Sequence, residues 1–304
     1  MDTVPEQFTR RIVAMYQAQG AEWLQCLPAI VAECAERWSL KVLPPFAPLS
    51  YNYVAPALRA DGTGVVLKVG MPHPELLTEM AALQLYDGRG SVALLEGDRA
   101  LGAMVLERLT PGVPLADHPD DEQATIIAAK VMRDLWQPVP SEHPFPHVAD
   151  WAAGLGDLRD QFGGATGPIP AALVATAETL FRELIGSMAE PVLLHGDLHH
   201  WNIVSAQRRP WLALDPKGVV GEAAYEVGAL LRNPIPYLLA KPNPQQLLAR
   251  RVDLLCELLG FPRERIIAWA LAQAVLAAWW SLDDNGQSAD AWIACAELFA
   301  AMRR

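Results

Sequence analysis

Residues 195–202 read His-Gly-Asp-Leu-His-His-Trp-Asn and directly follow the apolar run Val192–Leu194. A helix is predicted before them over residues 171–188, and Pro191 ends it, because a proline ring blocks the helical hydrogen bond. The helix is indicated by apolar residues at three- and four-residue spacing, namely Leu173, Ala177, Leu180, Phe181, Leu184 and Ile185. We therefore expect a buried helix and a short extended segment to hold residues 195–202, called the polar loop below.

Two short apolar segments after the polar loop predict a β-hairpin. Residues 203–205 and 211–214 are its strands, and the polar residues 206–210 join them. In an antiparallel pair, Asn202 at the entrance would lie beside Asp215 at the exit, with about 5 Å between their Cβ atoms. An amide oxygen and a carboxylate at one point suit Mg²⁺, which prefers oxygen ligands. We expect both side chains to bind one Mg²⁺ ion together with the phosphates of a nucleotide.

Asp197 lies five residues before Asn202 in the polar loop. A carboxylate in this position can accept the proton of a hydroxyl group. The pattern His-x-Asp-x-x-x-x-Asn, followed by a hairpin and then Asp215, matches the parts that transfer a phosphoryl group in kinases. The sequence thus predicts a phosphoryl-transfer site with Asp197 as the base.

Short apolar runs separated by turn residues predict a small, mostly antiparallel sheet in the first half of the chain. The runs are residues 40–43, 51–58, 65–69, 92–95 and 101–107. One helix, residues 74–86, is inserted between the third and fourth runs, and Gly88 ends it. Lys68 on the third run and Glu79 on the helix occupy the places of the Lys–Glu pair that serves the nucleotide phosphates in kinases. For Lys68, a lysine on the exposed edge of a sheet is the alternative.

Three regions follow from these patterns. Residues 6–37 have helical spacing, with Pro28 expected to start a second helix. Residues 110–114, Thr-Pro-Gly-Val-Pro, form a hinge. The chain is therefore divided into a helical arm (1–38), a sheet lobe (39–110) and a mainly helical lobe (111–304).

Helices are expected through most of the last region. They cover residues 121–136 and about 225–304, with breaks near 234–244 and 260–262. The apolar stretch 266–282 contains Gln273 and is interpreted as a buried core helix rather than a membrane span.

The formal net charge of −11 argues against a nucleic-acid or anionic-membrane partner, because both bind clusters of Lys and Arg. It would attract a cationic small molecule, or it only keeps the surface soluble. The four cysteines lack metal-type spacing and predict reduced, buried thiols in a cytoplasmic protein. The start of the chain does not resemble a secretory signal. The sequence makes no prediction of oligomeric state.

On these motifs the chain resembles the aminoglycoside phosphotransferases of the protein-kinase-like superfamily, and among them the streptomycin 6-kinase and hydroxyurea phosphotransferase branch. The resemblance covers nearly the whole sequence. The segments that carry it are residues 51–57, 65–70, 106–109, 195–202, 215–218 and 225–234. The last of them, Tyr-Glu-Val-Gly-Ala-Leu-Leu-Arg-Asn-Pro, is the most specific to the branch.

The resemblance implies a bilobal α+β fold, ATP and Mg²⁺ as cofactors, and transfer of the γ-phosphoryl group to a hydroxyl of a small molecule such as streptomycin. For the nucleotide, it implies that the backbone of Glu107 to Leu109 binds adenine and that Lys68 binds the phosphates. It implies that Asn202 and Asp215 bind Mg²⁺ and that Asp197 acts on the acceptor hydroxyl. Glu226 is implied to brace the polar loop. Two departures from the family pattern are visible. Residues 44–50 lack a glycine-rich phosphate cradle, and Glu222 stands where an aspartate is expected.

A small acceptor is expected because only about ten residues separate Asp215 from Tyr225. This leaves little room for the activation segment on which protein kinases bind peptides. Acidic residues of the helical lobe are expected to line a pocket for a guanidinium or ammonium substrate, namely Glu222, Glu226, Asp283, Asp284 and Asp290. For residues 283–286 an ordinary helix-ending turn is the alternative.

Three other functions compete with this interpretation. The first is a kinase of the same fold that acts on another small alcohol or amine, or on hydroxyurea. The second is a metal hydrolase that uses His195, Asp197, His199 and His200 as zinc ligands. The third is a nucleotide-binding protein with a dead active site, which predicts the loss of at least one key residue. None of Lys68, Asp197, Asn202 and Asp215 is missing.

Overall fold

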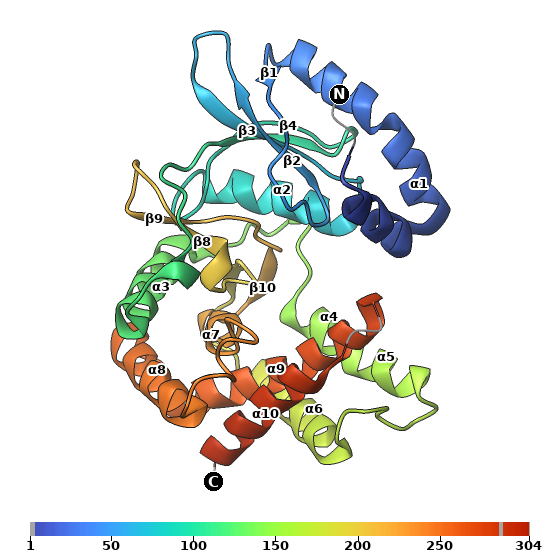
Figure 1. Ribbon diagram of the computed structural model, residues 1–304. Helices are drawn as coiled ribbons and strands as arrows, with labels where there is room; N and C mark the ends of the chain where they lie inside the picture. The colour runs from blue at the N-terminus through green and yellow to red at the C-terminus, as the bar shows by residue number, and fades with distance from the viewer. Residues whose placement is uncertain (1–3, 286–287, 304) are drawn as a thin grey trace. The chain divides into compact units, whose positions relative to one another are not determined.

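The structure is a computed structural model that describes residues 4–285 and 288–303, with the backbone alone at residues 284 and 285. The chain forms two compact units, Met1–Thr110 and Pro111–Arg304, whose elements are labelled in Figure 1. One unit contains a small antiparallel sheet and the other is mainly helical, which confirms the predicted α+β fold class.

The first unit is built on a five-stranded sheet in which every neighbouring pair is antiparallel. In spatial order its strands are β1 (Lys41–Val42), β2 (Tyr53–Leu58), β3 (Gly64–Val69), β5 (Ala103–Glu107) and β4 (Leu94–Asp98). Helix α2 (Pro74–Tyr86) connects β3 to β4 over the residues that were predicted. Strand β4 begins two residues later than predicted, and its register against β5 shifts between Leu94 and Glu96.

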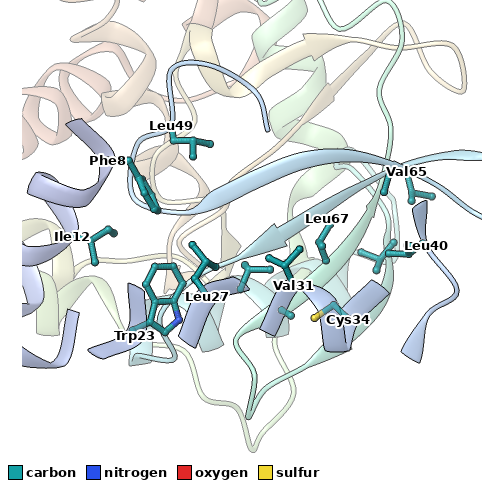
Figure 2. Packing of buried hydrophobic residues seen from close by; sticks show 14 residues of the cluster. Phe8, Ile12, Trp23, Leu27, Val31, Cys34, Leu40, Leu49, Val65 and Leu67 are labelled. Carbon is teal, nitrogen blue, oxygen red and sulfur yellow. The ribbon is translucent and has the colours of Figure 1, made fainter. Parts of the chain in front are cut away.

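Helix α1 (Glu6–Arg37) covers one face of this sheet, and Figure 2 shows the packing. The buried residues it contributes are Phe8, Ile12, Trp23, Leu27, Val31 and Cys34. They pack against Leu67, Val69 and other strand residues. Side chains alternate between the faces of a strand. Lys68, between Leu67 and Val69, therefore belongs to the opposite face, where its partner Glu79 of α2 lies.

The break in α1 is not where it was predicted. Gln17 has non-helical dihedrals (φ 51°, ψ −128°), whereas Pro28 lies inside the helix. Pro28 is exposed, and the buried residues Trp23, Leu27 and Val31 continue one face across it. This packing offsets the hydrogen bond that the proline ring removes.

The second unit is formed around helix α9 (Arg263–Asn285), which packs against α10, α6 and α7 (Figure 1). Its α-helices are α3 (Asp121–Leu135), α4 (Val148–Ala152), α5 (Gly154–Gln161), α6 (Ala171–Gly186), α7 (Val227–Leu231), α8 (Pro244–Leu259), α9 and α10 (Asp290–Met302). By length and composition the stretch Arg263–Asp283 of α9 is able to cross a membrane, but 78% of its apolar window is buried in the protein. This burial agrees with the predicted core helix.

Short strands and 3₁₀ turns complete the second unit. A three-stranded antiparallel sheet has the order β10 (Val219–Gly221), β7 (Val192–Leu194) and β6 (Gln137–Pro138). The predicted hairpin is present as β8 (Ile203–Ser205) and β9 (Trp211–Ala213). The 3₁₀ turns are η1 (Leu115–Asp117), η2 (His200–Asn202) and η3 (Ala223–Glu226). Strand β7 is paired on both sides, so the polar loop starts from a fixed point.

All four cysteines have free thiols. Cys34 and Cys295 are buried as predicted, whereas Cys26 is exposed and Cys256 is half-buried. Burial raises the pKa of the Cys34 and Cys295 thiols to about 11. These two thiols are therefore protonated and unreactive at neutral pH.

Candidate active site

His195, the first residue of the polar loop, is fully buried and joins three segments of the second unit. Its backbone N–H donates to Glu226 Oε2 (2.6 Å), and its carbonyl accepts from the N–H of Lys217 (2.8 Å). Its Nε2 lies 2.9 Å from the carbonyl of Leu214, and its Nδ1 accepts from the N–H of Asp197 (3.2 Å). Since a carbonyl only accepts, Nε2 carries the hydrogen. Burial lowers the pKa of His195 to about 4, so the ring is neutral at pH 7.

Glu226 holds the start of the polar loop through hydrogen bonds to its backbone. It is only 1% exposed, and its two oxygens accept the backbone N–H groups of His195 (2.6 Å) and Gly196 (3.0 Å). Gly196 has φ +84°, and a Cβ there would lie 2.7 Å from the ring of Trp151, so only glycine fits. The bracing contact expected of Glu226 is thus present. Its carboxylate is not exposed to a substrate, in contrast to the pocket-lining position also considered for it.

The pH dependence of stability should report on Glu226. Burial raises its pKa to about 7, although the two N–H groups act in the opposite direction. The folded state then binds the proton more tightly than the unfolded chain, so the contribution of Glu226 to the free energy of unfolding is full below about pH 4.5. It falls as pH rises toward 7 and is lost above that value. His195 acts oppositely, because its lowered pKa makes stability rise between about pH 4 and 6.5.

We therefore expect Glu226→Gln, which removes only the first of these two effects, to change the slope of stability against pH. The difference in unfolding free energy between wild type and Glu226→Gln should fall by on the order of 2–3 kcal/mol from pH 5 to pH 8. Urea unfolding at a series of pH values measures it. Parallel curves for the two proteins would contradict the raised pKa.

Asp197 is the acidic side chain of the polar loop that stays accessible, with 30% of the side chain exposed. Its Oδ1 lies 3.4 Å from Arg232 Nη2 and its Oδ2 lies 3.6 Å from His199 Nε2. Its carbonyl accepts from Asn202 Nδ2 (3.0 Å), which closes the loop. The carboxylate is therefore oriented by two basic side chains on a backbone that is fixed at both ends.

Arg232 and Gln273 belong to this arrangement and were not identified as site residues from the sequence. Arg232 Nη1 donates to Gln273 Oε1 (2.8 Å), and Gln273 Nε2 donates to the carbonyl of Tyr225 (2.5 Å). Both side chains are buried. Two signals were available: Gln273 is a lone polar residue in an apolar helix, and Arg232 lies in the segment most specific to the branch.

Asn202 and Asp215 lie at the ends of the hairpin, but they are not directly opposite each other. Ile203 pairs with Ala213, and the N–H of Leu214 donates to the carbonyl of Asn202 (2.9 Å). The partner of Asn202 is therefore Leu214, and the predicted direct pairing with Asp215 is wrong by one residue. Asp215 has φ +59°, so the alternation of the strand does not continue through it.

The donor set at this hairpin end fits Mg²⁺. The amide nitrogen of Asn202 is used by the carbonyl of Asp197, which leaves its amide oxygen as the ligand atom. The buried imidazole of His195 fixes the carbonyl of Leu214, immediately before the carboxylate of Asp215. One amide oxygen and one carboxylate are typical of a site in which water and phosphate oxygens supply the other ligands of Mg²⁺.

The zinc-hydrolase alternative lacks a ligand set. Within residues 4–285 and 288–303, no three His, Cys, Asp or Glu side chains are arranged to bind a metal ion. Both ring nitrogens of His195 are used by the backbone. His200 is buried, and its pKa is lowered well below the usual range by burial and by the charge of Arg251.

In the first unit, the structure brings Lys68 and Glu79 together. Lys68 Nζ lies 2.5 Å from Glu79 Oε1, and the two residues are only 4% and 7% exposed. Strand β3 lies between β2 and β5, which rules out an exposed edge lysine. The segment expected to bind adenine begins at Glu107, the last residue of β5, and continues through Leu109.

Of the remaining acidic residues expected to line a cationic pocket, Glu222 is buried and bound within the protein, as its contacts show. Glu222 is buried and accepts from Arg265 Nε (2.6 Å), Arg265 Nη2 (2.7 Å) and the indole of Trp269. Its charge is therefore used inside the protein. Asp283 is exposed near the end of α9, and the side chain of Asp284 lies outside the described residues.

A sheet unit with a buried Lys–Glu pair, together with a helical unit that presents the polar loop, defines a phosphotransferase of the protein-kinase-like fold. Residues 41–285 match the aminoglycoside/hydroxyurea antibiotic resistance kinase family, and the chain belongs to this family. It is an enzyme that phosphorylates a hydroxyl group.

Two characterised relatives illustrate the range of this family. A streptomycin 6-kinase of Streptomyces griseus is 32% identical over 294 residues, which cover 93% of this chain and 92% of that protein. A hydroxyurea phosphotransferase of Kitasatospora aureofaciens is 33% identical over 280 residues, which cover 88% of this chain and 77% of that protein. The branch-level resemblance is thereby confirmed.

Solved structures show the same fold at lower identity. A thermostable mutant of the aminoglycoside phosphotransferase APH(4)-Ia, in complex with ADP and hygromycin B, aligns with a TM-score of 0.62 at 16% identity, covering 90% of this chain and 97% of that one. The choline kinase LicA from Streptococcus pneumoniae aligns with a TM-score of 0.61 at 14% identity, covering 90% and 99%. At these identities the similarity concerns the fold alone.

Proposed function

We propose that this enzyme transfers the γ-phosphoryl group of ATP to a hydroxyl of an aminoglycoside such as streptomycin. The observation that carries the proposal is the accessible carboxylate of Asp197 in a loop whose preceding backbone, at residues 195 and 196, is held by the buried Glu226. The names of the relatives support the acceptor. Strand β10 begins four residues after Asp215, so this part of the chain has no long segment for peptide binding and favours a small acceptor.

In the proposed mechanism, Asp197 accepts the proton of the acceptor hydroxyl as the oxygen attacks the γ-phosphorus, and the bond from that phosphorus to the bridging oxygen breaks to release ADP. Arg232 and His199 orient the two carboxylate oxygens, and Asn202 fixes the backbone of the same residue. Glu226 prevents the loop from moving, because it bonds the two N–H groups that precede Asp197. Positioning of this kind is a main part of catalysis when the protein does little covalent chemistry.

Roles in nucleotide binding are assigned within each unit by itself. Lys68 serves the α and β phosphates and is oriented by Glu79, and the backbone of Glu107 and Leu109 binds adenine. Asn202 and Asp215 would hold Mg²⁺, which neutralises phosphate charge when it is bound. We also assign the enzyme to the cytoplasm, where ATP is available and the four thiols stay reduced.

A second acceptor, hydroxyurea, is favoured by the 33% identical relative that carries this name. Its N-hydroxyl group would take the place of the sugar hydroxyl at Asp197. The same residues would act on it, so the two acceptors are separated by experiment rather than by the geometry of the loop.

The test is a screen of ADP release with streptomycin, hygromycin B, hydroxyurea and choline, in the presence of Mg²⁺. Mass spectrometry of the product should show the gain of one phosphoryl group on streptomycin. If hydroxyurea alone is phosphorylated, hydroxyurea rather than an aminoglycoside is the acceptor. Absence of product with every compound would refute the proposed substrate class.

A further inference from the structure

The second unit contains a cavity of about 390 Å³ that none of the proposed roles uses. Its wall is formed by η1, the start of α3, two residues of the polar loop, the turn that precedes α8, and α8 itself. The volume falls in the range of small-molecule sites, about 300–1,000 Å³. This space is large enough for a ring of sugar size.

His200 of the polar loop lines this cavity and is only 2% exposed. Neither ring nitrogen, Nδ1 nor Nε2, has a hydrogen-bond partner among the described residues. A buried polar group without a partner costs about 1–3 kcal/mol. A neutral imidazole has one N–H donor and one acceptor nitrogen, on opposite sides of the ring. A hydroxyl both donates and accepts, so a hydroxyl that reaches either nitrogen is a suitable partner for it.

The charges in the cavity wall are balanced. Arg251 is bound by Asp121, with Nη2 2.5 Å from Oδ1, and its Nη1 donates to the carbonyl of Asn233 (2.6 Å). The other charged pair of residues in the wall, Asp117 and Lys241, carries one charge of each sign. A cationic group would find no excess of carboxylates here. An uncharged ligand fits this wall better than the guanidinium first expected in the helical lobe.

Two exposed aromatic residues are part of the same wall. Trp201 is 42% exposed and Tyr237 is 60% exposed, which is unusual for side chains of this size. Aromatic faces bind flat apolar surfaces, and the C–H face of a sugar ring is such a surface. Stacking on the rings and hydrogen bonding at His200 together are the requirements of a hydroxylated ring.

The cavity is also close to the reacting group. His200 follows Asp197 by three residues, and three residues span at most about 11 Å. The carbonyl of Asp197 bonded to Asn202 and the 3₁₀ turn η2 make the loop more compact than this limit. A molecule with one hydroxyl at Asp197 can therefore place a second ring in the cavity.

We propose that this cavity binds an uncharged, hydroxylated ring of the acceptor, separate from the ring that is phosphorylated. The inference rests on the proposed function, since it assigns a subsite for the same acceptor. His200 provides the hydrogen bonds and Tyr237 the stacking surface. Both residues bind the acceptor equally before and during transfer, so they should affect KM more than kcat.

The test compares Tyr237→Ala with Tyr237→Phe, which keeps the ring and is the matched control. With streptomycin, KM should rise about tenfold in Tyr237→Ala and stay near wild type in Tyr237→Phe. With streptidine, which lacks the further rings of streptomycin, the two variants should be alike. Ala116→Phe, which fills the cavity from η1, should raise KM for streptomycin in the same way.

The outcomes separate this inference from the proposed function. If streptomycin is phosphorylated and Tyr237→Ala and Ala116→Phe both keep the wild-type KM, the cavity assignment is wrong and the kinase assignment stands. If no aminoglycoside is phosphorylated, saturation-transfer NMR with an uncharged methyl glycoside tests sugar binding in the cavity independently of kinase activity. If wild type gives a saturation-transfer signal and Ala116→Phe does not, the cavity is a sugar site. If wild type gives no signal, or Ala116→Phe keeps it, the cavity assignment is wrong.

Discussion

Replacing Asp197 by asparagine should lower kcat by about a thousandfold or more while nucleotide affinity stays unchanged. General acid–base catalysis contributes about 10²–10⁴ to enzymatic rates, and an amide cannot take up the hydroxyl proton. The substitution keeps the size of the side chain, and the braces of the loop act on backbone groups at residues 195, 196 and 197. The loss should therefore be chemical rather than structural.

Single-turnover transfer to the acceptor found in the screen measures this effect, and titration with a fluorescent ATP analogue measures nucleotide binding. Asp253→Asn is the matched control, because Asp253 is 55% exposed on α8 and its ion pair with Arg263 is a surface pair of small effect. A kcat above one tenth of wild type in Asp197→Asn would remove this residue from the role of base.

The sequence predicts those parts of the site that depend on local spacing. Helix α2, the polar loop and the hairpin follow from periodicity, proline placement and turn residues within about 20 residues of each other. The Lys68–Glu79 contact also follows, because strand and helix are adjacent in the chain. Each of these features needs only one element and its neighbour.

Features that depend on distant parts of the chain were missed. Strands β6 and β10 have two and three residues, too few to show a period, and they form only because β7 lies between them. Asn202 pairs with Leu214 rather than with Asp215, and Asp215 has a left-handed backbone conformation. The residue type at position 215 does not by itself predict that conformation. The contact of Arg232 with Gln273 joins residues that are 41 positions apart.

Counting charges also cannot distinguish a carboxylate in a pocket from one that is neutralised in the core. Glu222 was expected to meet a substrate, but it forms a two-point ion pair with Arg265 while only 3% exposed. The net charge of −11 thus overstates what a cationic acceptor would meet. The balanced wall of the cavity at His200 leads to the same conclusion.

Replacing Lys68 by methionine should have two large effects, one on catalysis and one on stability. The ammonium group that we assign to the nucleotide phosphates would be lost, so kcat/KM for ATP should fall at least about a hundredfold. The carboxylate of Glu79 stays buried without this partner, which should lower the free energy of unfolding by about 3–5 kcal/mol. Lys41→Met, on the exposed strand β1 of the same sheet, is the matched control and should change stability by less than about 0.5 kcal/mol.

A double variant separates the two effects of Lys68. Adding Glu79→Leu to Lys68→Met removes the buried charge, so urea unfolding should recover most of the lost stability, because buried pairs can be replaced by apolar groups at little cost. Activity should stay low, since the ammonium group assigned to the phosphates is still missing. Recovery of kcat/KM together with stability would mean that Lys68 acts only on folding, and a wild-type kcat/KM for ATP in Lys68→Met alone would exclude it from the nucleotide site.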